Sequence, residues 1–209
     1  MSTSVRRGRG RPPAAKSADT RGPILRTARE VFGEVGYEAA TFQAIAERAE
    51  LTRPAINHYF SSKRELYCRV VEQTNGALIE AGIAEARAHE GFAERIHAFI
   101  TAVQIRADHS AAAFLAISVL ESQRHPELAE SGNDGLTSLR GFIDWALGDA
   151  QAAGELRADI NTDAVAATLL AMLLGMGFYV GFIGAHKSLT DVSAEFLRLM
   201  QGEGFLRRD

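Results

Sequence analysis

The spacing of hydrophobic residues predicts helices along most of the chain. From Arg21 on, apolar residues recur at intervals of three and four, as on one face of a helix: Ile24, Leu25, Ala28, Val31, Phe32 and Val35. Similar stretches cover residues 42–49, 53–60, 92–103, 110–123, 136–153, 162–185 and 192–200, and another runs from Ser61 or Ser62 to about residue 88. We find neither the alternation typical of strands nor a long repeat. The pattern therefore predicts an all-α fold of about nine helices.

Start and stop residues define the first three helices. Pro23 suits the first turn of a helix, and Gly36 is typical of a left-handed cap at its end. Thr41 and Thr52 are each well placed to cap a short helix. Pro54 lies in the first turn after Thr52, so it begins the third helix and does not break it. Two short helices joined by a tight turn indicate a helix-turn-helix.

One helix is hydrophobic on every side. Residues 164–185 include no charge over 22 positions, which is long enough to cross a membrane. This segment stands alone, however, and basic residues do not cluster at either end. A helix that is apolar all round can instead be buried on all sides. We interpret it as packed between its own core and a partner subunit, where Gly177 and Gly181 allow close approach.

Charge is divided unevenly along the 209 residues. Residues 1–69 have 13 Lys and Arg against 7 Asp and Glu, a net charge of +6, whereas the remainder carries −9. A basic head on an acidic body favours a polyanionic partner for the head. The only cysteine, Cys68, and the absence of an apolar segment in the first 23 residues fit a cytoplasmic protein without a signal peptide.

The first 20 residues are rich in Arg, Gly, Pro and Ala, and we expect a flexible arm. Within it, the sequence RGRP resembles the core of an AT-hook. Arg9 and Arg11 could then lie in an A·T-rich minor groove, where the negative potential attracts arginine. The alternative is a tail that only adds positive charge.

Catalytic and metal-binding patterns are weak. Ser61, His58 and Glu65 contain the residue types of a triad, but their short helical segments imply no pocket. The histidines show no zinc-binding spacing, and no phosphate-binding glycine motif is present. We expect no enzymatic activity, no cofactor and no metal.

Residues 24–67, ILRTAREVFGEVGYEAATFQAIAERAELTRPAINHYFSSKRELY, contain a more specific pattern. The stretch resembles the DNA-binding domain of the TetR family of bacterial transcriptional regulators, with matching residues at Ala28, Phe32, Gly36, Tyr37, Thr41, Ile45, Ala46, Ala49, Thr52, Arg53, Tyr59, Phe60, Ser62, Lys63 and Leu66. The resemblance implies a homodimer on a pseudo-palindromic operator. It also implies a C-terminal domain that binds a small molecule and dimerises through its last two helices. Binding of that effector would move the heads apart and release the DNA.

The resemblance places the DNA contacts on the third helix and beside it. Arg53 is the first choice for reading a base, because arginine pairs bidentately with guanine; Thr52 and Ala55 are weaker candidates. Phosphate contacts are expected from Thr41, His58, Tyr59 and Lys63, and Asn57 could bond a phosphate or an adenine. Two positions depart from the family pattern. Glu50 replaces a frequent glycine in the turn, and Asn57 replaces a frequent aromatic residue.

The later helices supply many apolar side chains for an effector pocket. A pocket lined by aromatic and methionine residues would suit an apolar ligand, and the candidates are Phe99, Val103, Phe114, Ile117, Phe142, Trp145, Met172, Met176 and Tyr179. The alternative for each is ordinary core packing. Gln104, Ser118 and Glu121 are possible polar anchors, although Glu121 lies near a helix end and is expected to be solvated. With the glycines above, Phe196 and Met200 are expected at the dimer interface.

These observations predict three segments: an arm over 1–20, a DNA-binding domain over 21–66, and a ligand-binding and dimerisation domain over 67–209. The function they favour is a sequence-specific DNA-binding regulator, a repressor released by an apolar effector. Two other interpretations stay open. One is a ligand-binding or scaffold protein that keeps the helix-turn-helix as a structural module, and the other is a membrane-associated protein anchored by the helix over 162–185.

Overall fold

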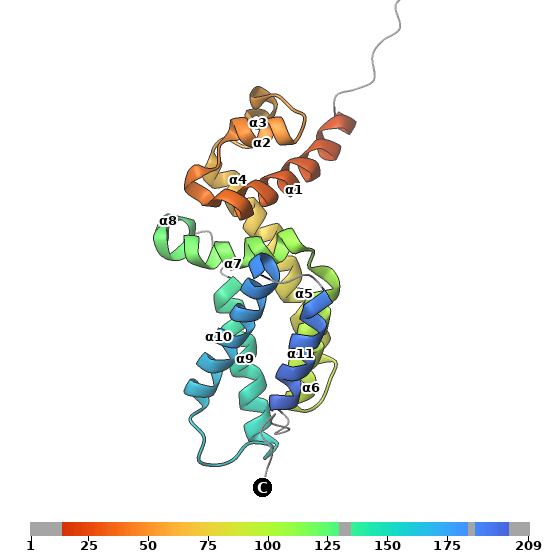
Figure 1. Ribbon diagram of the computed structural model, residues 1–209, viewed down its shortest axis with the longest axis vertical. Coiled ribbons are helices and arrows are strands. Elements are labelled where there is room, and N and C mark those ends of the chain that lie inside the picture. Colours follow the sequence, from red (N-terminus) through yellow and green to blue (C-terminus); the bar gives the residue numbers. More distant parts are fainter. Residues whose placement is uncertain (1–13, 130–134, 184–186, 201–209) are drawn as a thin grey trace, which may run out of the picture.

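The computed structural model describes residues 14–129, 135–183 and 187–200, and these residues form helices without any strand. The first three helices form a head at one end of the molecule: α1 Ala14–Ala39, α2 Phe42–Arg48 and α3 Arg53–Tyr59 (Figure 1). The all-α prediction is therefore confirmed. Arg9 and Arg11 of the AT-hook-like sequence lie outside the described residues.

Two details of α1 differ from the prediction. The helix begins at Ala14, inside the segment predicted to be a flexible arm, so Pro23 lies within the helix and not in its first turn. Gly36 does interrupt the helix, with φ 77° and ψ 175°. That ψ value is extended, so the residue is not the left-handed α cap expected from the sequence. It is a kink, and one further turn leads to Ala39.

A long helical run connects the head to the body. It comprises α4 Lys63–Val71, a π-helical turn η1 Glu72–Gly76, and α5 Ala77–Arg87. Ser62 caps it, since its hydroxyl accepts a hydrogen bond from the Glu65 N–H at 3.1 Å. The sequence predicted this run as a single helix to about residue 88. The π turn, which places one extra residue in the turn, was not predicted.

In the described part of the chain, the body has six further helical segments and one π turn: α6 Phe92–Arg106, α7 His109–Arg124, the single turn α8 Pro126–Ala129, α9 Gly135–Ala152, α10 Thr162–Phe178 with η2 Tyr179–Ile183, and α11 Lys187–Met200. Asn161 caps α10, and Gly154 follows α9 with φ 74°. Apart from the one-turn α8, each segment corresponds to a predicted helix.

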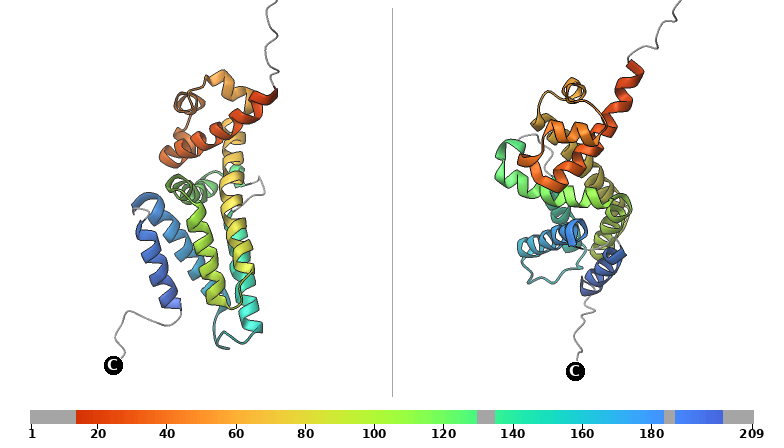
Figure 2. Two further views of the ribbon diagram at one scale, coloured as in Figure 1. Left: turned by 90° about the vertical axis from the view of Figure 1, so that its right-hand side faces the viewer. Right: turned by 45° about the horizontal axis from the view of Figure 1, so that its top comes forward.

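Helix α7 lies across the molecule between the head and the long body helices, as Figures 1 and 2 both show. Helix α1 packs on it closely at Gly33, where a Cβ atom would come within 3.6 Å of the Phe114 backbone nitrogen. Phe114 of α7 and Leu128 of α8 join the core of the head, which is formed by residues such as Phe32, Ile45 and Phe60. Head and body therefore share a hydrophobic core at their junction.

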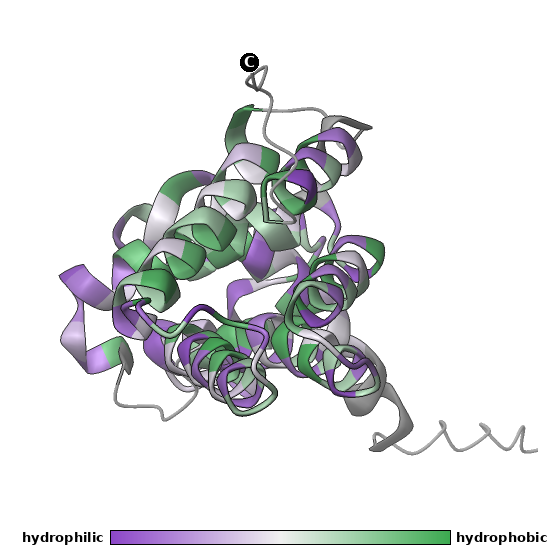
Figure 3. Ribbon diagram, turned by 90° about the horizontal axis from the view of Figure 1, so that it is seen from below, coloured by the Kyte–Doolittle hydropathy of each residue, from purple (hydrophilic) through white to green (hydrophobic). Residues whose placement is uncertain are grey.

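A second core holds the body together. It is built by α5, α6, α9, α10 and α11, whose apolar side chains include Ile96, Phe99, Phe142, Ile143 and Leu169. Seen from below, these helices bring hydrophobic stretches toward one another and leave many polar positions outside (Figure 3). Apart from α10, which is apolar on every side, this is the amphipathic arrangement that the three-and-four spacing predicted.

Candidate DNA-binding surface and effector cavity

The two threonines predicted as caps hold the helix-turn-helix in shape. The Thr41 hydroxyl accepts a hydrogen bond from the Ala44 N–H at 3.1 Å, and the Thr52 hydroxyl accepts one from the Ala55 N–H at 3.4 Å. Each cap satisfies a backbone donor that the first turn of a helix leaves open. Both predicted caps are confirmed.

The turn between α2 and α3 depends on an unusual backbone conformation at Glu50. Its φ is 55°, the only positive value among the non-glycine residues that the structure describes. The Leu51 N–H bonds to the Ala46 carbonyl at 2.9 Å across this residue, which closes the end of α2. Glycine adopts a positive φ without strain, whereas a side chain makes it costly. The departure from the family pattern at position 50 therefore places strain in the turn.

Helix α3 presents a polar face to solvent. Thr52, Arg53, Asn57 and His58 are exposed, and Ala55 is half-buried. Neither Arg53 nor Asn57 forms a hydrogen bond or ion pair with the residues that the structure describes. Ile56, on the opposite side of α3, is fully buried in the head core. The side chains predicted to contact DNA are thus exposed and accessible to a DNA duplex.

Tyr59 and His58 lie at the end of this face. Tyr59 is half-buried and packs against the head core, while its ring meets the His58 ring edge-on at a centroid distance of 5.2 Å. The phosphate contacts proposed for this pair remain predictions.

Lys63 has a structural role that the sequence did not reveal. Its ammonium donates to the carbonyl oxygens of Tyr37 at 2.8 Å and Glu38 at 3.0 Å, and lies 4.5 Å from the centre of the Tyr37 ring. These contacts join the start of α4 to the last turn of α1. A lysine has three N–H donors, so one remains for the phosphate that the family pattern assigns to this residue.

Helix α1 is attached to α7 near both ends of α7. At the start, Asp108 caps α7 and its carboxylate accepts from the Arg29 guanidinium at 2.7 Å. In the last turns, the Glu121 carboxylate accepts from the Tyr37 N–H at 3.2 Å. The polar clamp, as we call these two pairs, fixes the head relative to α7.

Glu121 corrects a prediction. It was expected to be solvated near a helix end, but it is only 6% exposed because α1 packs across it. A Cβ atom on Gly36 would lie 2.8 Å from its carboxylate oxygen, so the glycine leaves room for the acid. The imidazole of His125 lies 3.5 Å from the same carboxylate and 3.3 Å from that of Glu38.

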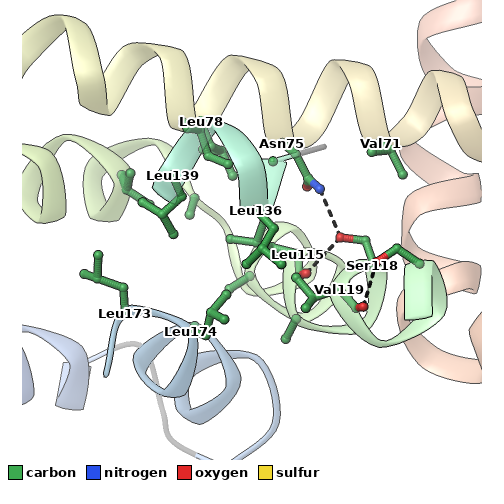
Figure 4. A pocket seen from close by; sticks show the side chains of 18 of the residues that line it. Val71, Asn75, Leu78, Leu115, Ser118, Val119, Leu136, Leu139, Leu173 and Leu174 are labelled. Atoms are coloured by element: carbon green, nitrogen blue, oxygen red, sulfur yellow. Dashed lines mark hydrogen bonds between the residues drawn. The ribbon is translucent and has the colours of Figure 1, made fainter. Parts of the chain in front are cut away.

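A cavity of about 600 Å³ lies below α7, enclosed by the α4–η1–α5 run, α6, α7, α9 and α10. Its volume is in the range of small-molecule sites. The walls are mainly aliphatic, with Leu78, Leu139, Leu173 and Leu174 in view in Figure 4. Of the residues predicted to form an effector pocket, Phe99, Val103 and Met176 line this cavity, as do the proposed polar anchors Gln104 and Ser118.

The other predicted pocket residues do not line it: Phe114, Ile117, Phe142, Trp145, Met172 and Tyr179. Phe114 belongs to the head core, and Phe142 stacks on Phe99 in the body core at 4.9 Å. Trp145 is partly exposed, with the Arg95 guanidinium 4.6 Å from its ring. Met172 faces outward from α10. Their placement depends on helix packing, which residue type alone does not reveal.

The wall formed by the α4–η1–α5 run was not predicted from the sequence. Val71, Asn75, Leu78 and Ile79 line the cavity there. The sequence contained one indication of this wall. Asn75 is a polar residue at a helix position where the spacing of apolar residues predicts a buried side chain.

All four residues predicted at the dimer interface make contacts within the subunit. Gly181 packs within the chain, because a Cβ atom there would come within 2.6 Å of the Ala113 backbone on α7. Phe196 is buried in the body core, Met200 packs against that core, and Gly177 lines the cavity. Gly181 and Phe196 are therefore corrected to positions inside the subunit.

A different part of α10 carries exposed apolar residues. Over Thr162–Ile183 the helix is long and apolar enough to cross a membrane. Only 22% of an apolar 18-residue stretch within it is buried in the subunit. The exposed residues lie at helical spacing, as an outer stripe formed by Ala164, Ala167, Ala171, Met172, Gly175, Phe178 and Phe182. An exposed apolar strip of this length indicates an interaction surface.

The exposed polar face of α3, the capped helix-turn-helix and the cavity beneath α7 together define a DNA-binding transcriptional regulator with a ligand-binding body. Residues 24–70 match the family model "Bacterial regulatory proteins, tetR family". The head of the chain is therefore a DNA-binding domain of the TetR type.

Relatives agree with this assignment. The HTH-type transcriptional regulator UidR of Escherichia coli is 28% identical over 183 residues, which covers 85% of this chain and 84% of UidR. The HTH-type transcriptional repressor AcnR of Corynebacterium efficiens is 34% identical over 65 residues, 31% of this chain and 35% of AcnR. The fold matches that of FadR from Bacillus subtilis, solved in complex with stearoyl-CoA, with a TM-score of 0.67 at 18% identity. The match covers 84% of this chain and 97% of FadR.

Proposed function

We propose that this protein is a cytoplasmic, homodimeric repressor that leaves its operator when an apolar small molecule fills the cavity below α7. It acts without enzymatic chemistry. One observation carries the proposal: the cavity and the DNA-binding head are connected by the same two helices. Helix α7 lines the cavity and holds α1 through the polar clamp, while α4 lines it and begins at Lys63, which holds the end of α1.

The nature of the effector is supported by the cavity lining. The charged residues among the lining, Glu65, Arg69 and Glu72, are at least partly exposed, and Arg69 pairs with Glu72 at 2.7 Å. Aliphatic side chains provide most of the interior wall. Burial of an apolar ligand against such a wall is favourable by roughly 25 cal/mol per Å². FadR from Bacillus subtilis, which shares this fold, was solved in complex with stearoyl-CoA, and this supports the proposal of an apolar effector here.

Dimerisation is proposed through the outer stripe of α10. Phe178 is 45% exposed and Phe182 is 43% exposed, and the centroids of their rings lie 5.1 Å apart. We expect Phe178→Glu to give a monomer in sedimentation velocity, whereas Ile105→Glu, at an apolar residue 78% exposed on α6, should leave the dimer intact. Protein that stays in solution only with detergent would instead support the membrane-associated alternative.

The DNA-binding claim is tested with fluorescence anisotropy, using the DNA upstream of the protein's own gene against shuffled DNA of equal length. At moderate salt the wild type should prefer the upstream DNA clearly. Arg53→Ala should lose about 1–3 kcal/mol of that preference and relax it at one base pair per half-site, because a bidentate guanine contact is worth about this much. Equal binding of both DNAs by the wild type would refute the proposed function.

A further inference from the structure

Asn75 places a polar group in the wall of the largely apolar cavity. It lies in the π turn η1 and is 4% exposed. Its Nδ2 donates to the Ser118 hydroxyl at 3.0 Å, and that hydroxyl donates to the Leu115 carbonyl of its own helix at 2.8 Å. Figure 4 shows this chain of hydrogen bonds running from η1 to α7 along the cavity.

The direction of this chain fixes the orientation of the amide. A carbonyl oxygen can only accept, so the single Ser118 proton goes to Leu115 and the hydroxyl must accept from Asn75. The amide therefore turns its NH₂ group toward Ser118. Its Oδ1 points away from that bond and meets no donor among the residues that the structure describes.

A second lining residue, Tyr67, also has a buried polar atom without a partner among the described residues. Tyr67, on α4, is 2% exposed, and its hydroxyl forms no hydrogen bond with the described part of the chain. Tyr67 and Asn75 are eight residues apart, which in a regular α-helix turns the second side chain about 80° away from the first. The extra residue of the π turn compensates for most of that rotation. Both residues consequently line the same cavity.

The remaining uncharged polar side chains of the inner wall are already bonded. Ser122 donates to the Val119 carbonyl at 2.8 Å, and Gln104 donates to the Ser193 hydroxyl. A buried acceptor without a donor is costly, and proteins seldom keep one without a reason. Among the described lining residues only Asn75 and Tyr67 keep such an atom, and the Tyr67 ring packs into the head core against Phe32 and Tyr37. Asn75 is therefore the residue that we assign to the cavity.

We propose that Asn75 Oδ1 is the recognition point for the polar group of the effector. The effector is then an uncharged, mostly apolar molecule that carries a hydrogen-bond donor, such as an alcohol, a phenol or an amide N–H. An ionised end group is disfavoured at Asn75, because the charged residues among the described lining, Glu65, Arg69 and Glu72, are at least partly exposed and none is buried beside the amide. This inference rests on the proposed function, since it names the chemical class that the same cavity accepts.

The test uses two probes that share an apolar body, 4-octylphenol and 4-octylanisole. Only the phenol can donate a hydrogen bond to Asn75 Oδ1, because the anisole oxygen has no proton. In isothermal titration calorimetry on the full chain, the wild type should bind the phenol about tenfold more tightly, the worth of one net buried hydrogen bond. Asn75→Leu should reduce this ratio to about twofold or less by weakening phenol binding, with the affinity for the anisole retained.

A matched control and a second variant make the result decisive. Ser122→Ala removes a cavity hydroxyl that is bonded within its own helix, and it should keep the tenfold ratio. Ser118→Ala keeps the amide but removes the acceptor that orients it, so the ratio should fall even if Asn75→Leu does not fold.

Equal affinities for the two probes in the wild type, or binding of neither, would overturn the inference. The same protein samples are tested for specific DNA binding. Specific DNA binding without a preference for the phenol removes only the inference, whereas loss of specific DNA binding in the wild type removes the proposed function.

Discussion

The close contact of Gly181 with α7 gives a sharp test of how the body is packed. In Gly181→Ala the new methyl group would lie 2.6 Å from the Ala113 Cα and backbone nitrogen and 3.0 Å from the Ala112 carbonyl carbon. Carbon atoms in contact are normally about 3.5–4.0 Å apart, so the backbones must separate by roughly 1 Å. Helix α7 has little room to move, because α1 packs on it at Gly33.

The size of the effect follows from two opposing contributions. Overpacking of this kind costs about 1–3 kcal/mol, while replacing a helical glycine by alanine contributes roughly 0.5–1 kcal/mol in the other direction. Because two backbone atoms would lie only 2.6 Å from the methyl group, we take the upper part of the overpacking range, about 2–3 kcal/mol. Subtracting about 1 kcal/mol of helix propensity leaves a net loss of about 1–2 kcal/mol. For a chain of this length, 1 kcal/mol shifts the melting temperature by about 2–4 °C, so Tm should fall by about 2–8 °C.

Gly148 is the matched control. It lies inside α9, and no atom lies within 4 Å of the position that a Cβ would take, so Gly148→Ala gains helix propensity without a clash. Its Tm should rise by about 1–4 °C. Thermal unfolding followed by circular dichroism, at a low and a high protein concentration, measures both variants. A Gly181→Ala protein as stable as wild type would refute the intrachain contact. A loss of stability that appears only on dilution would return Gly181 to the dimer interface.

Three further substitutions test the head and its attachment. Glu50→Gly should stabilise the protein by about 1 kcal/mol in urea unfolding, because glycine adopts φ 55° without strain, and unchanged or lower stability would contradict that strain. Lys63→Ala should lower stability by about 1–2 kcal/mol through loss of its bonds to the end of α1, and should also reduce the salt dependence of DNA binding by about one charge; an unchanged salt slope would leave Lys63 with the structural role alone. Partial burial raises the pKa of Asp108, but hydrogen bonds from the Ala111 N–H and the Ser110 hydroxyl and the charge of Arg29 more than offset it and leave the pKa lowered. Its stabilising contribution is therefore present above the ordinary carboxyl pKa and is lost as the pH falls through the lowered value. Asp108→Asn should cost about 0.5 kcal/mol at neutral pH, given the exposure of this ion pair, and nothing in strong acid; a pH-independent difference would contradict the electrostatic origin.

Local signals were sufficient for most of the helices and for the side-chain caps at their starts, although not for the π turn η1 or the kink at Gly36. Thr41, Thr52 and Asn161 each cap a helix through a hydrogen bond to a backbone N–H three residues ahead, so the sequence around them contains the whole interaction. The exposed face of α3 could be predicted equally well, because its orientation follows from helical spacing and from the buried Ile56.

Cavity residues could not be found in the same way. Phe99 and Phe142 are the same residue type at apolar helix positions, and their rings stack on each other, yet only Phe99 lines the cavity. Which side of a stacked pair faces an open space depends on the angles between helices, and these depend on contacts between distant segments. Glu121 was misjudged for the same reason, since the group that buries it, the Tyr37 backbone, is 84 residues away in the sequence.

Helix α7 offers a physical route from the cavity to the head. Phe114 and Glu121 are seven residues apart and so lie on one face, which packs against α1. Leu115, Val119 and Ser122 form the adjacent face, about 100° around the helix, and line the cavity. A ligand that pushes on the second face must move the first, because a close-packed helix does not deform between its two sides.

The polar clamp determines how that movement reaches the DNA. Since α1 is held near both ends of α7, by Arg29 with Asp108 and by Tyr37 with Glu121, a displacement of α7 carries α1 with it as a rigid unit. Glu121→Gln keeps the acceptor for the Tyr37 N–H but removes the charge, while Glu121→Ala removes both. If the clamp transmits the signal, Glu121→Ala should keep effector binding yet need several-fold more effector to release DNA in the anisotropy assay, and Glu121→Gln should stay near wild type. Equal release curves for all three proteins would show that the signal travels through α4 instead, where Lys63 makes the other connection to α1.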